Sequence, residues 1–135
     1  MSEFDWTAIV GSTEEVADTY TTPPDLKECK LHYAQIDERG TSVTLMLETT
    51  ELPDKPALAW ANREYNTVEI YLRFTGVKGL KINGWEAGAR DAEIILSPQG
   101  SKGVRVSVEA AGSQLSFEAS ESSLIRTRSY LSGKE

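Results

Sequence analysis

Asn66-Thr-Val-Glu-Ile-Tyr-Leu-Arg-Phe74 is the stretch of sequence that decides the fold. Apolar side chains occupy every second position in it, and polar or mixed ones occupy the positions between. The first set is Val68, Ile70, Leu72 and Phe74, and the second is Thr67, Glu69, Tyr71 and Arg73. A period of two is typical of a β-strand with one face in a core and the other facing away. The stretch therefore predicts a strand over residues 67–74.

Similar alternation continues on both sides of this strand. It covers residues 31–34, 43–47, 80–82, 92–96, 104–108 and 115–119, with turn segments at residues 37–40, at 98–100 and near Gly112. Residues 122–131 are expected to form a final strand, although both of its faces are mixed. In the first run, Leu31 and Tyr33 are expected on one face, and His32 and Ala34 on the other. Short links without intervening helices favour antiparallel pairing. The sequence predicts a mainly β fold, an antiparallel β-sandwich or partly closed barrel of about eight strands.

The first 25 residues have helical rather than strand periodicity. Apolar residues recur three and four positions apart, at Trp6, Ile9 and Val10 and then at Val16 and Tyr20. The tetrapeptide Ser12-Thr-Glu-Glu15 resembles a capping box, which predicts Ser12 as an N-cap. Helices this short are stable only when docked on something larger. One or two short N-terminal helices are therefore expected at an edge or end of the β structure.

Length and composition limit the classes of protein to consider. A chain of 135 residues suits one domain, so residues 1–135 are expected to form a single unit. No apolar run is long enough to cross a membrane and no secretory leader is visible, so no membrane partner and a cytoplasmic location are expected. The one cysteine, Cys29, excludes an internal disulfide and suits a reducing compartment.

Charge is distributed unevenly along the chain, whose formal net charge is −7. Residues 1–66 contain 13 acidic and 5 basic side chains, whereas residues 67–135 contain 8 acidic and 9 basic ones. An acidic half repels phosphate backbones, so nucleic acid is not expected as a partner. The same charge would speed the encounter with a basic protein. The alternative is that these acidic side chains only keep the chain in solution.

Residues that could carry catalysis are few. His32 is the only histidine and has no neighbouring cysteine pair, so neither a metal nor another cofactor is expected. No nucleotide-binding or nucleophile motif is present. Glu48 and Glu69 could face each other if their strands are neighbours, as a carboxylate pair requires. Two ordinary strand-face acids, with Cys29 as a buried apolar residue, are the simpler interpretation, so the chain is not expected to be an enzyme.

Two groups of side chains are candidates for binding. Tyr71 should point away from the core and form a mixed apolar and acidic patch with Met46, Glu48 and Glu69, which is the predicted partner-binding surface. Loops at residues 51–65 and 84–90 compete with it. The second group is the aromatic set Trp60, Trp85 and Tyr65, which would suit a carbohydrate- or ligand-binding β module. The tryptophans could instead fold back and cap the core.

One set of segments extends over most of the chain: residues 6–11, Tyr20, residues 24–26, Leu52-Pro53 with Trp60, residues 66–77, residues 80–85 and Ser129-Tyr130. In these segments the chain resembles bacterial polymorphic-toxin immunity proteins of the type called immunity protein 50. The resemblance implies a cytoplasmic inhibitor that binds a cognate toxin domain stoichiometrically and needs no cofactor. Many toxin domains of this kind attack nucleic acids and are basic, which would fit the acidic half of the chain. Edge strands could also pair two copies into a homodimer.

Overall fold

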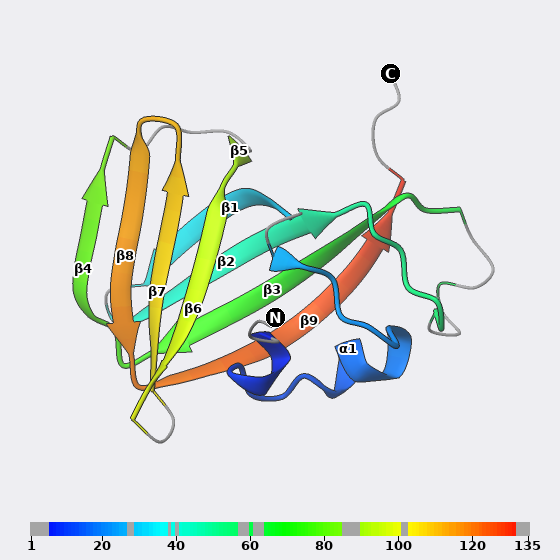
Figure 1. Cartoon of the computed structure of the whole chain (residues 1–135), viewed down its shortest axis with the longest axis horizontal. Helices are drawn as coiled ribbons and strands as arrows, with labels where there is room; N and C mark the ends of the chain where they lie inside the picture. Colours follow the sequence, from blue (N-terminus) through cyan, green and yellow to red (C-terminus); the bar gives the residue numbers. More distant parts are fainter. Residues whose placement is uncertain are drawn as a thin grey trace.

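Two antiparallel sheets pack against each other and cross at a steep angle (Figure 1). The computed structural model describes residues 6–26, 29–37, 39, 41–56, 60, 64–84, 90–100 and 103–131. The larger sheet has the order β5-β1-β2-β3-β9, formed by Arg90–Asp91, Lys30–Asp37, Ser42–Thr49, Thr67–Thr75 and Glu121–Tyr130. The smaller sheet has the order β4-β8-β7-β6, formed by Lys78–Asn83, Ser113–Ala119, Gly103–Ala110 and Glu93–Gln99.

The predicted β-sandwich is confirmed. Eight of the strands have six residues or more, and β5 has two. Within the described residues the sheets stay open and do not close into a barrel. No helix among these residues is long and apolar enough to span a membrane.

The inner faces of the two sheets form the core. Alternate residues of β2 and β3 point into it, and Leu45, Leu47, Ile70, Leu72 and Phe74 have essentially no exposed surface. The rings of Phe74 on β3 and Phe117 on β8 meet edge to face, with centroids 5.4 Å apart, and so join the two sheets. The alternation predicted for residues 67–74 is therefore the alternation that divides core from outer face.

One strand departs from the predicted alternation. Tyr33 was expected on the same face as Leu31, but Leu31 is buried whereas Tyr33 is 40% exposed. The pairing of β1 with β2 shifts between these residues, so that Leu31 lies opposite Leu47 and Tyr33 lies opposite Met46. An extra residue in one strand of a pair moves the following side chains to the opposite face. This β-bulge brings Tyr33 to the face that points away from the core.

Residues 6–26 lie along the part of the larger sheet that the smaller sheet does not cover (Figure 1). They contain a 3₁₀ turn, η1 (Trp6–Ala8), and a short helix, α1 (Glu14–Thr19). Val16 and Tyr20 are buried in the core, as their helical spacing predicts. Gly11 forms a parallel bridge with Ser123 and so covers part of the free edge of β9.

The predicted capping box is wrong. The N-cap of α1 is Thr13, one residue later than expected, and its side chain makes no capping hydrogen bond. Ser12 has a φ of 60°, which is the left-handed region. Tertiary contacts rather than capping therefore hold this segment: Trp6 Nε1 donates to the Pro24 carbonyl oxygen at 2.7 Å, and the Tyr20 hydroxyl donates to the Glu51 carbonyl oxygen at 2.6 Å.

The contact between Phe74 and Phe117 generates a stability prediction. Replacing a buried phenylalanine by alanine leaves a cavity, so Phe74→Ala is expected to lower the free energy of unfolding by about 3–5 kcal/mol. Urea denaturation followed by circular dichroism measures it. Ile125→Ala on β9, at a residue that is 40% exposed, is the control and should change stability by less than about 0.5 kcal/mol. Equal effects of the two variants would contradict this description of the core.

Candidate functional site

The four predicted binding residues lie together on the larger sheet. The pairing of β2 with β3 sets Met46 opposite Tyr71 and Glu48 opposite Glu69. Directly opposed residues in an antiparallel pair share one face and are close enough to interact. That face points away from the core, and we call it the outer face; it carries these four residues with their neighbours on β1 and β9.

The four residues form the floor of the outer face and contribute little of its accessible surface. Met46, Glu69 and Tyr71 are only 3%, 8% and 6% exposed, and Glu48 is half-buried. The accessible part belongs to flanking side chains. His32 and Arg128 side chains are 45% and 53% exposed. A partner would therefore meet the flanking residues first, and the floor would act largely through them.

Each glutamate of the floor is held by side chains from other positions on the face. Glu69 Oε1 accepts a hydrogen bond from the Tyr71 hydroxyl at 2.9 Å and lies 3.6 Å from Arg128 Nε. Glu48 Oε2 accepts a hydrogen bond from the Tyr130 hydroxyl at 2.6 Å and lies 2.8 Å from His32 Nδ1. A carboxylate withdrawn from water needs such partners, because an unpaired buried charge is costly.

An arginine completes the centre of the outer face. Arg126 on β9 lies opposite Tyr71, and its guanidinium carbon stands 4.5 Å from the centre of the Tyr71 ring. This cation–π arrangement depends on a second bulge, since the pairing of β3 with β9 shifts next to Tyr71. Ile125 is the extra residue, and without the shift it would take the place of Arg126 opposite Tyr71.

The surroundings of Tyr71 change its acidity. Burial and the hydrogen bond to Glu69 raise the pKa of the Tyr71 phenol above its usual value, and Arg126 opposes this shift. The folded chain therefore favours the neutral hydroxyl, which is the form that can donate to Glu69.

Exposed charges are distributed unevenly over the two sides of the larger sheet. The outer face presents four exposed cations, Lys30, Arg73, Arg126 and Arg128, and two exposed acids at one end, Asp37 and Glu121. Most exposed side chains around α1 are acidic, at Glu14, Asp18, Glu51 and Asp54, and Lys55 lies among them. The α1 segment contributes to the core, so these acids lie on the core-facing side of the larger sheet. Sequence reasoning located the acidic half of the chain but missed the separation of the two charges in space.

Sequence reasoning also missed most of the residues around the floor. Tyr33, Arg126, Arg128 and Tyr130 reach the outer face through register shifts and long-range pairing. The only available signal was the mixture of apolar and basic residues in the last strand.

The aromatic set gives little support to a ligand-binding module. Trp60 is buried and packs edge to face with Tyr65, their ring centroids 5.7 Å apart. Trp60 therefore caps the core, which was the alternative to a ligand-stacking role. Trp85 lies outside the described residues.

The residues considered for catalysis are separated or already engaged. Cys29 is buried in the core, with its Sγ 3.5 Å from the Asp25 carbonyl oxygen, whereas His32 is on the outer face. Glu48 and Glu69 do oppose each other, but both are hydrogen-bonded within the face. No group of three potential metal ligands occurs among the described residues.

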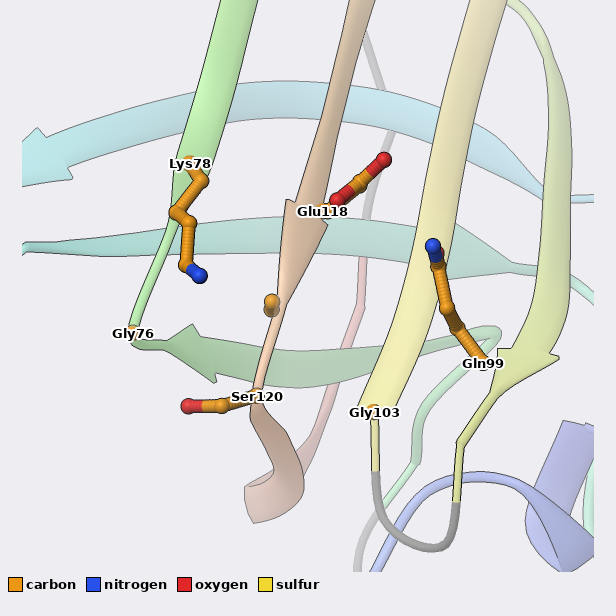
Figure 2. Close-up of a pocket in the computed structure, with 7 residues that line it drawn as sticks. Gly76, Lys78, Gln99, Gly103, Glu118 and Ser120 are labelled. Carbon is orange, nitrogen blue, oxygen red and sulfur yellow. The ribbon is translucent and has the colours of Figure 1, made fainter.

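A hollow lies on the side of the molecule away from the outer face, where the strands of the smaller sheet meet the end of β3 (Figure 2). It measures about 280 Å³ and is lined by Gly76, Lys78, Gln99, Gly103, Glu118, Ala119 and Ser120. Backbone geometry accounts for its two glycines. Gly76 has a φ of 64°, and a β-carbon on it would collide with the Ser120 hydroxyl. A β-carbon on Gly103 would collide with the Gln99 carbonyl oxygen. The hollow therefore follows from the close approach of these strand ends.

Comparison with known proteins gives one result. Residues 12–130 match the family model described as immunity protein 50, and this range contains every described strand. No curated protein and no solved structure gives a significant match to the chain.

The acidity of the buried tyrosines predicts how stability depends on pH. A folded-state pKa above that of the unfolded chain contributes stability that is present below about pH 10 and is lost as the pH rises further. Burial raises the pKa of Tyr20 as well, so Tyr20 and Tyr71 act with the same sign.

We predict that Tyr20→Phe and Tyr71→Phe each reduce the loss of unfolding free energy between about pH 8 and about pH 11, and that the double variant reduces it further. Urea denaturation at a series of pH values measures the effect. A parent-like pH dependence in the double variant would contradict the proposed environment of the two hydroxyls.

Proposed function

The chain belongs to the immunity protein 50 family, and from this premise we propose that it binds and neutralises a cognate bacterial toxin domain. Neutralisation is by stoichiometric occlusion in the cytoplasm of the cell that makes both proteins, and the chain itself catalyses no reaction and needs no cofactor. The observation that carries the proposal is the family match over residues 12–130, because it includes all of the sheet that presents the outer face.

The outer face is the contact surface in this proposal. Tyrosine and arginine are enriched at protein interfaces, and they supply much of the binding energy where they are well packed. Here Tyr33, Arg126 and Arg128 surround the floor formed by Met46, Glu48, Glu69 and Tyr71. Hydrogen bonds already hold both glutamates of the floor, so little side-chain freedom is lost when a partner binds. A stable complex would bury on the order of 1,600 Å².

The acidic side of the molecule has a separate part in the proposal. Glu14, Asp18, Glu51 and Asp54 create a negative region that attracts a basic toxin over long range and raises the rate of encounter. This step predicts that association slows as salt is added. Fast, salt-independent association would remove the encounter step and leave the contact surface unaffected.

The proposal extends to the pairing of two copies through their sheet edges. Part of the β9 edge is covered by Gly11, and the remaining edges could add a strand from a second copy. A concentration-dependent mass in sedimentation experiments would establish it.

Co-expression tests the proposed function directly. A toxin domain encoded next to the gene for this chain is expected to stop bacterial growth alone and to permit growth when this chain is produced with it. The purified pair should form a one-to-one complex, measured by light scattering. Failure of this chain to restore growth, or restoration without a complex, would contradict neutralisation by binding.

Substitutions in the floor test the contact surface. Glu69→Lys combined with Tyr71→Ala is expected to weaken the complex by about tenfold to a hundredfold, because it removes the floor on which the exposed groups rest. Calorimetric titration measures the affinity. Both of these residues are buried, so the double variant could also affect folding. Tyr33→Ala is the companion variant, because the Tyr33 side chain is exposed and its loss should weaken binding without disturbing the core.

Arg105→Ala on the smaller sheet is the control for both variants. Arg105 is exposed and pairs with Glu118 on the opposite side of the molecule, so its loss should leave affinity unchanged. Unchanged affinity in Tyr33→Ala and in the folded double variant would remove the outer face from the proposal.

A further inference from the structure

We propose that the outer face recognises an acidic surface segment of its protein partner and holds the carboxylates of that segment with Lys30, Arg73, Arg126 and Arg128. The inference rests on the proposed function, since it takes the partner to be a toxin domain and names the chemistry of the surface that the domain presents. It goes beyond that function because the net charge of the chain, −7, would suggest a basic contact surface on the partner and not an acidic one.

The difference in solvent exposure between the acidic and the basic groups of the outer face supports this inference. The carboxylates of Glu48 and Glu69 lie in the floor, where hydroxyl groups, His32 and Arg128 already engage them. The four cations are exposed above and around them. At the centre of the face, accessible positive side chains therefore surround two withdrawn negative ones, and the exposed acids Asp37 and Glu121 lie at one end. Arg128 lies 3.6 Å from Glu69 through its Nε, and its side chain is still 53% exposed. A surface that approaches the centre meets positive charge first, and complementary charge favours carboxylates there.

The placement of the two central arginines supports it further. Arg126 and Arg128 are two residues apart on one strand and project to the same face, opposite Tyr71 and Glu69. The Arg126 guanidinium carbon lies 4.5 Å from the centre of the Tyr71 ring, so the ring helps to hold this group at the centre of the face. Guanidinium groups can pair with carboxylates through two parallel hydrogen bonds, which ammonium groups cannot do. The aromatic ring thus holds a carboxylate-binding group in place.

A protein partner fits this surface better than a nucleic acid. The whole chain carries a net charge of −7, and Asp37 and Glu121 lie on the same face towards one end of the sheet. A phosphate backbone has a high, continuous charge density and would be repelled by these groups. A folded protein can place a few carboxylates against the four cations and keep the rest of its charge elsewhere. The acidic side chains around α1 can then attract basic regions of the same partner.

Charged peptides test the inference without knowledge of the toxin. The probes are a fluorescently labelled peptide with four glutamates, called polyglutamate below, a peptide with four lysines, and a single-stranded oligothymidine long enough to cross the whole face. They are titrated at about 0.1 M salt, where the Debye length is about 10 Å. Polyglutamate is expected to bind, and Arg126→Glu with Arg128→Glu should weaken that binding by about tenfold or more. The neutral pair Arg126→Gln with Arg128→Gln should weaken it less, and it covers the case in which the reversed charges prevent folding.

Lys78→Glu with Lys81→Glu is the matched control. It makes the same change in net charge on the smaller sheet, and binding of polyglutamate should change by less than about twofold. Four results would overturn the inference: no binding of polyglutamate by the parent chain, equal weakening by the control, tighter binding of oligothymidine that the arginine variants abolish, or a homodimer that these variants dissociate.

Co-expression separates failure of this inference from failure of the proposed function. If the parent chain restores growth and both arginine pairs do so equally well, the toxin binds elsewhere and the inference fails alone. If the parent chain does not restore growth, the proposed function fails, and the peptide titrations still decide whether the outer face selects carboxylates.

Discussion

Burial of β3 on both faces is the constraint on which the rest of the structure depends. Its inner side chains join the two sheets, and its outer side chains Glu69 and Tyr71 are almost as inaccessible to water. A glutamate in such a position is tolerated only with hydrogen-bond partners. The Tyr71 hydroxyl and Arg128 provide them from β3 and β9. The same requirement operates one strand away, where His32 and Tyr130 hold Glu48.

This constraint links the fold to the proposed function. The partners that compensate the two carboxylates also fix the side chains that remain accessible, because Arg126 rests on Tyr71 and Arg128 lies beside Glu69. A network of this kind favours one register of the sheet, since a shift by one residue would place the glutamates in the core. The result is a surface with hydrogen-bonded side chains that offers positive groups at its centre, on a chain whose overall charge is negative. In the proposed function, local charge on this surface selects the partner and the acidic region around α1 attracts it.

The sequence predicted the architecture well, and it predicted which four candidate residues share a face, whereas their role in binding stays a prediction. The period of two in residues 67–74 correctly identified β3, and the alternation in β2 and β3 placed Met46, Glu48, Glu69 and Tyr71 on one face. It could not place Tyr33, Arg126 or Arg128, because two β-bulges shift their register and bulges leave no clear mark in a single sequence. Burial of the floor was also not predictable. It depends on which strands flank β2 and β3, and that is long-range information.

The central claim is that the outer face of the larger sheet, with its exposed arginines, is where a partner binds. The structure of this chain in complex with its toxin domain tests that claim most directly. We expect the guanidinium groups of Arg126 and Arg128 to be covered and paired with carboxylates of the partner, while the carboxylates of Glu48 and Glu69 keep their present contacts. A complex in which the outer face stays open to solvent would contradict the account.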